Sequence, residues 1–83
     1  MTDIALFNDE GVTAVFVHST AALTKADQVA TALGLEVDWD AGSDTPEGCV
    51  AVGCASLCPT CFDEFEEHLT RAGLVVFVEA SSH

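Results

Sequence analysis

The sequence predicts a small α+β domain whose main elements follow the order β-α-β-β-α-β. Two observations carry this prediction. Apolar residues change twice from strand-like to helical spacing along the 83 residues. Each helical run ends at a glycine, Gly34 or Gly73, and a strand-like run follows directly. With 49% apolar residues the chain can form a core, and its length predicts one domain over residues 1–83.

The first half of the chain predicts a strand, a helix and a second strand. Residues 12–18 are a β-branched and aromatic run. Ser19, Thr20 or Thr24 can cap the helix that follows, and Gly34 ends it. Residues 35–39 then alternate apolar and acidic side chains, as in a strand with one wet face. The helix is predicted from apolar residues at helical spacing: Ala22, Ala26, Val29, Ala30 and Leu33.

The second half repeats the pattern after a loop. Residues 41–48 are rich in Gly, Ser, Asp and Pro, which predicts a loop. A short buried strand is expected over residues 50–52. A helix should begin at Pro59 or Thr60 with one apolar face and end at Gly73. The run Leu74 to Val78 is apolar on both faces and predicts the final strand.

This element order is typical of the ferredoxin-like α/β sandwich, in which two βαβ units interleave. Residues 4–7 predict an additional N-terminal strand, which would form a hairpin with residues 12–17 across residues 8–11. Strands that are apolar on both faces need cover on the second face of the sheet. We therefore expect a homodimer that packs sheet against sheet.

The charge balance is strongly acidic. Fourteen Asp and Glu residues face only Lys25 and Arg71, for a formal net charge of −12. This composition resembles that of proteins from halophilic archaea, so most carboxylates are interpreted as solvating groups. Nucleic-acid binding needs clustered Lys and Arg, which the chain lacks. No apolar run is long enough for a membrane span and no signal peptide is recognisable, so we expect a cytoplasmic protein with reduced thiols.

Four cysteines within thirteen residues are the main functional signal, because several thiolates at short spacing can surround one metal ion. We expect Cys54, Cys58 and Cys61 to bind zinc, with Cys49 or His18 as competing fourth ligands. In an extended strand Cys49 would lie roughly 16 Å from Cys54, so it joins only if the strand is broken. His18 is expected at the mouth of the Cys54–Cys61 turn. We favour the set of four cysteines.

Two resemblances suggest other chemistries for the same residues. The C-x3-C-x2-C spacing of Cys54, Cys58 and Cys61 resembles the iron–sulfur motif of radical S-adenosylmethionine enzymes, over eight residues only. It implies that an iron–sulfur cluster is an alternative cofactor to zinc. The Cys58-Pro59-Thr60-Cys61 segment is similar to the dithiol of thioredoxin-like proteins, which implies thiol redox chemistry.

The sequence thus favours a small metal-binding protein with a structural, regulatory or protein-interaction role and no enzymatic activity. An iron–sulfur or dithiol redox carrier is the second interpretation, and a metal-free dimeric interaction module is the third. Carboxylates such as Asp63 and Glu64 oppose ionisation of a free thiol at the adjacent cysteines, whereas a bound divalent metal ion offsets their negative charge. By that criterion the sequence ranks metal binding above redox chemistry.

Overall fold

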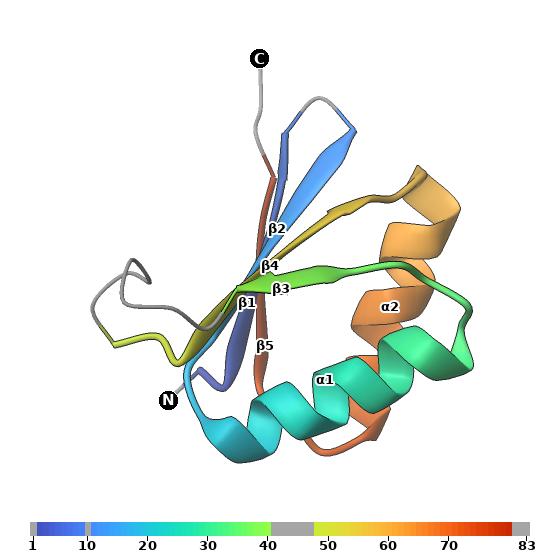
Figure 1. The fold of residues 1–83 in the computed structure, drawn as a ribbon. Helices are drawn as coiled ribbons and strands as arrows, with labels where there is room; N and C mark the ends of the chain where they lie inside the picture. The colour runs from blue at the N-terminus through green and yellow to red at the C-terminus, as the bar shows by residue number, and fades with distance from the viewer. Residues whose placement is uncertain (1, 10, 41–47, 81–83) are drawn as a thin grey trace.

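The structure is a computed structural model that describes residues 2–9, 11–40 and 48–80. Two helices lie on one side of a five-stranded sheet, with the predicted β-α-β-β-α-β order and the additional N-terminal strand (Figure 1). The elements in chain order are β1 (Ile4–Asp9), β2 (Val12–Val17), α1 (Thr20–Ala32), β3 (Asp38–Asp40), β4 (Ala51–Ser56), α2 (Pro59–Arg71) and β5 (Val76–Ala80). Most of the loop predicted over residues 41–48 lies outside the described residues.

The N-terminal strand is inserted into the sheet and does not extend its edge. The strand order is β3-β4-β2-β1-β5. The predicted hairpin is confirmed, since β1 pairs antiparallel with β2 from Ile4↔Val17 to Asp9↔Val12. A plain ferredoxin-like sheet would pair β2 with β5, whereas here β1 lies between them and pairs parallel with β5. The insertion makes the sheet mixed.

Both helices begin and end where local sequence signals place them. The Ser19 side chain caps α1 by accepting a hydrogen bond from the Ala22 N–H at 3.1 Å. Pro59 opens α2, where its missing N–H costs nothing. Gly34 and Gly73, with φ of 72° and 91°, follow the two helix ends.

Strands β3 and β4 differ in length from the prediction. Strand β4 runs from Ala51 to Ser56 and is longer than expected, whereas β3 is reduced to three residues. Trp39 of β3 lies over Gly53 of β4, and its indole N–H donates to the Asp27 carboxylate of α1 at 3.2 Å. An ideal Cβ on Gly53 would lie 2.7 Å from the Trp39 ring. The absence of a side chain on Gly53 therefore leaves room for the indole ring to pack over this edge of the sheet.

The core lies between the sheet and the helices. Alternate strand residues, such as Leu6 on β1 and Val15 on β2, face Phe65 and Leu69 of α2 or the alanines of α1. The opposite face of the sheet is more exposed: Val75 and Phe77 retain 52% and 53% of their accessible surface. The predicted homodimer through this face stays a prediction.

In the described parts of the chain, neither α1 nor α2 is long and apolar enough to cross a membrane.

Candidate thiol site

Cys58 and Cys61 meet at the first turn of α2. Cys58 is the N-cap residue of the helix, and its sulfur accepts a hydrogen bond from the Cys61 backbone N–H at 3.3 Å. This is the position that Ser or Asp usually occupies, where a side-chain acceptor satisfies one of the unpaired N–H groups of a helix start. The Cys-Pro-Thr-Cys spacing therefore places two thiols one helical turn apart, with one of them over the positive end of the helix dipole.

The two thiols differ in acidity. The hydrogen bond from the Cys61 thiol, followed by that from the Cys61 backbone N–H, lowers the pKa of Cys58 below its ordinary value. The same thiol–thiol hydrogen bond raises the pKa of Cys61, and burial and the negative charges of Cys58 and Glu64 add to that rise. Cys58 is exposed and Cys61 is partly buried. The pair thus consists of an accessible sulfur that ionises first and a neighbouring thiol that stays protonated.

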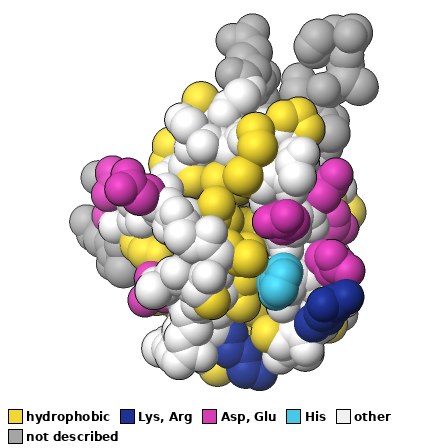
Figure 2. Space-filling view, turned by 90° about the vertical axis from the view of Figure 1, so that its right-hand side faces the viewer, with side chains coloured by type: hydrophobic (Ala, Val, Ile, Leu, Met, Phe, Trp, Pro, Cys, Tyr) yellow, Lys and Arg dark blue, Asp and Glu magenta, His cyan; other side chains and the backbone are white. Residues whose placement is uncertain are grey.

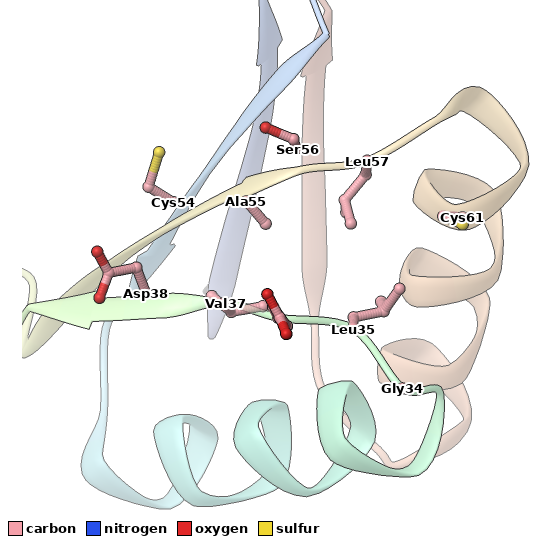
Figure 3. Close-up of a pocket in the computed structure, with 10 residues that line it drawn as sticks. Gly34, Leu35, Val37, Asp38, Cys54, Ala55, Ser56, Leu57 and Cys61 are labelled. Atoms are coloured by element: carbon pink, nitrogen blue, oxygen red, sulfur yellow. The ribbon is translucent and has the colours of Figure 1, made fainter.

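Cys54 lies on β4, apart from this pair. It is exposed and pairs with Ala14 on one side and Asp38 on the other. Figure 3 shows its sulfur on the side of the strand away from the helices, whereas Cys61 lies on α2. The regular strand holds Cys54 in that orientation, because successive side chains in a strand point to opposite faces.

Cys49 and His18 form a separate pair at the other end of β4. The His18 Nδ1 lies 3.8 Å from the Cys49 sulfur and 3.0 Å from the Gly48 carbonyl oxygen. Since a carbonyl only accepts, this contact assigns the hydrogen to Nδ1. The expectation that His18 lies at the mouth of the Cys54–Cys61 turn is wrong. Strands β2 and β4 are antiparallel, so the end of β2 meets the beginning of β4.

The four cysteines are therefore distributed along β4 and the start of α2. Within residues 2–9, 11–40 and 48–80, no three His, Cys, Asp or Glu side chains are grouped closely enough to hold a metal ion. A site with Cys54, Cys58, Cys61 and Cys49 or His18 would require the regular strand to rearrange. Zinc or iron–sulfur binding at these residues stays a prediction.

A groove adjoins the Cys58–Cys61 pair. It has a volume of about 690 Å³ and opens where β3 and β4 diverge (Figure 3). Sequence reasoning missed this groove because it depends on how far the β3–β4 ladder extends. The acidic residues at alternate positions 36 and 38 are the available signal, but in so acidic a chain the sequence favours their interpretation as solvating groups. The groove is lined by residues 34–38, residues 54–57 and Cys61.

The chain's two basic side chains act elsewhere. The Lys25 ammonium donates to the Ala72 carbonyl at the end of α2, and Arg71 pairs with Glu67 at 2.8 Å. On the side of the molecule shown in Figure 2, acidic side chains lie on both sides of a band of hydrophobic ones. The pKa of Cys58 is therefore lowered by hydrogen bonds at the start of α2 and not by a nearby Lys or Arg.

Comparisons with protein-family models, with curated proteins and with solved structures found no match for this chain.

Proposed function

We propose that the protein is a small thiol–disulfide carrier in which Cys58 is the attacking sulfur and Cys61 the resolving one. The observation that carries the proposal is the hydrogen-bonded arrangement of these two residues at the start of α2. It supplies what exchange requires: an accessible sulfur with enhanced thiolate character and a second thiol within the same turn.

The chemistry is a two-electron exchange. The Cys58 thiolate attacks a substrate disulfide, forms a mixed disulfide with one substrate sulfur, and releases the other as a thiolate. Cys61 loses its proton to solvent and attacks the Cys58 sulfur. The Cys58–Cys61 disulfide forms, the second substrate thiolate leaves, and the substrate disulfide has gained two electrons. The reverse sequence transfers a disulfide to a substrate dithiol.

The different pKa shifts favour this division of roles. The thiol–thiol hydrogen bond, burial and the negative charges of Cys58 and Glu64 raise the pKa of Cys61, whereas hydrogen bonds lower that of Cys58. Glu64 thus adds to the delay in ionisation of the resolving thiol, and the attacking thiol keeps its hydrogen bonds. In the reducing cytoplasm that the sequence predicts, the resting form would be the dithiol.

The test is a redox titration of protein purified in high salt, followed by peptide mapping. We expect one reversible two-electron couple, with the disulfide located between Cys58 and Cys61 by mass spectrometry. Elemental analysis is run on the same sample. Stoichiometric zinc or iron that blocks alkylation of these cysteines would overturn the proposal and support the metal-binding interpretation. Absence of a Cys58–Cys61 disulfide over the whole range of potentials would overturn it as well.

A further inference from the structure

The edge of β4 beside the thiol pair carries backbone groups that lack a strand partner. The direction of the ladder hydrogen bonds establishes this. The His18 N–H donates to the carbonyl oxygen of Asp3, the residue before β1, at 3.0 Å, so the backbone N–H and C=O of His18 point toward β1. The next residue back, Val17, therefore points toward β4, and its carbonyl accepts from the Val50 N–H at 2.7 Å. From Val17 the backbone direction alternates along β2, and because the ladder pairs Val17 with Ala51, the alternation along β4 is counted from Ala51 and not from Val50.

Alternation then fixes the directions at the far end of β4. Ala55, opposite Thr13, points its N–H and C=O toward β2, so Ser56 points its own toward the β3 side. On that side the ladder with β3 stops at Asp38↔Cys54. Within the described residues, Ser56 therefore presents a donor and an acceptor along an open strand edge that faces the groove.

The groove beside this edge has the features of a peptide-binding site. Leu35, Val37 and Leu57 give it an apolar lining (Figure 3). Glu36 and Asp38 add negative charge. An open strand edge binds extended peptides through main-chain hydrogen bonds, and adjacent pockets receive alternate side chains. Of the residues that the structure describes, no Lys or Arg lines the groove, so the two carboxylates would repel an acidic occupant.

We propose that this groove binds an extended, cationic polypeptide segment, which adds as a strand along β4 and brings its own cysteine to Cys58. The proposal rests on the thiol–disulfide function and specifies its substrate class as protein disulfides flanked by Lys or Arg. Small anionic disulfides would lack both the main-chain pairing and the favourable charge. The β4 edge leads directly through Leu57 to Cys58, so a bound strand runs beside the reacting sulfur.

Exchange kinetics with matched peptides test the charge preference. Two peptides of the same length carry one cysteine as a mixed disulfide with thionitrobenzoate, and they differ only in flanking Lys or Glu. We expect the Lys peptide to release the chromophore about tenfold faster or more at low salt, with the ratio falling as salt screens the charges. The double variant Glu36→Gln with Asp38→Asn should reduce this ratio.

A matched control separates the groove from the general charge of the protein. Glu66→Gln with Glu79→Gln removes the same charge from α2 and from β5, at the opposite edge of the sheet from β3. We expect this variant to keep most of the ratio. Equal losses in the two double variants would overturn the assignment to the groove, as would faster reaction of a small anionic disulfide than of the Lys peptide.

Backbone methylation tests the added strand itself. In a Lys peptide whose cysteine is replaced by serine, N-methylation at the residue facing Ser56 should abolish binding, whereas N-methylation at the adjacent residue should not, because their N–H groups point in opposite directions. Equal effects at both positions would overturn strand addition. The outcomes also separate the two proposals: without a Cys58–Cys61 disulfide both fail, while a disulfide with equal peptide rates leaves only the groove assignment wrong.

Discussion

The two ends of β4 carry cysteines in opposite structural settings. At its beginning, Cys49 precedes the strand and contacts a single histidine, His18. Beyond its end, Cys58 caps a helix and interacts with both the backbone and the thiol of Cys61. The difference in sulfur acidity between the two ends follows from the hydrogen-bond donors that the backbone supplies. A helix start supplies several at once, whereas a strand start directs its donors to a neighbouring strand.

The largest expected effect is on disulfide exchange, when a cysteine is substituted at one end of β4 or the other. Cys58→Ser should abolish disulfide exchange, because a serine hydroxyl does not form a disulfide and the partly buried Cys61 is left without a partner thiol in its helical turn. Cys49→Ser should leave exchange unchanged. Free-thiol titration after mild oxidation, with peptide mapping, measures both. Loss of exchange in Cys49→Ser would show that the two ends act together and would contradict their independence.

The middle of β4 keeps the two ends apart, and Gly53 is its most constrained point. Gly53→Ala should lower the free energy of unfolding by about 2 kcal/mol, because the new methyl group overlaps the Trp39 ring and the Val37 side chain. Urea denaturation in constant high salt measures the change. In a Trp39→Leu background the same substitution should cost less. An equal cost in both backgrounds would contradict the proposed overlap.

The pH dependence of labelling sharpens the contrast within the reactive end. Cys58, with its lowered pKa, should react with iodoacetamide at lower pH than Cys61, whose pKa is raised. Below both pKa values the thiolate fractions differ by about tenfold for each unit that separates them. The labelling ratio should therefore fall as the pH rises from the pKa of Cys58 to that of Cys61, and it should approach one above both. Quantitative mass spectrometry of the two labelled positions tests this order, and preferential labelling of Cys61 would contradict it.

The smallest expected effect concerns a buried hydroxyl beside the reactive end. Thr13, which pairs with Ala55 of β4, is fully buried, and its Oγ1 has no hydrogen-bond partner among the described residues. Thr13→Val keeps the shape of the side chain and removes the unsatisfied group, so it should raise stability by about 1 kcal/mol. Thr24→Val, at an exposed position of α1, is the matched control. A destabilised Thr13→Val protein would show that the hydroxyl is satisfied in solution.

Most of the fold could be predicted from local patterns. Gly34, Gly73, Ser19 and Pro59 mark helix ends by their own conformational preferences, and the structure places the helices at those residues. The hairpin of β1 and β2 was also readable, because Gly11 with its φ of 82° allows a tight reversal. The position of β1 between β2 and β5 could not be predicted, since β1 could have paired with either edge of β2.

The candidate site was predictable in composition but not in arrangement. The spacing of Cys58 and Cys61 places them one turn apart in any helix that starts there, and the structure brings them together. The positions of the other predicted metal ligands, Cys49, Cys54 and His18, depended on strand direction. His18 meets Cys49 because β2 and β4 are antiparallel, and Cys54 stays separate because β4 continues through it. Neither fact is encoded in the spacing of the cysteines.

The chain alone determined which segments form helices and strands, because capping residues, glycines and apolar periodicity act over a few neighbouring positions. Tertiary pairing decided which sulfur atoms can cooperate and where the sheet leaves an edge open. Those properties arise from hydrogen bonds between segments distant in sequence, and each segment satisfies its own local preferences equally well in several pairings.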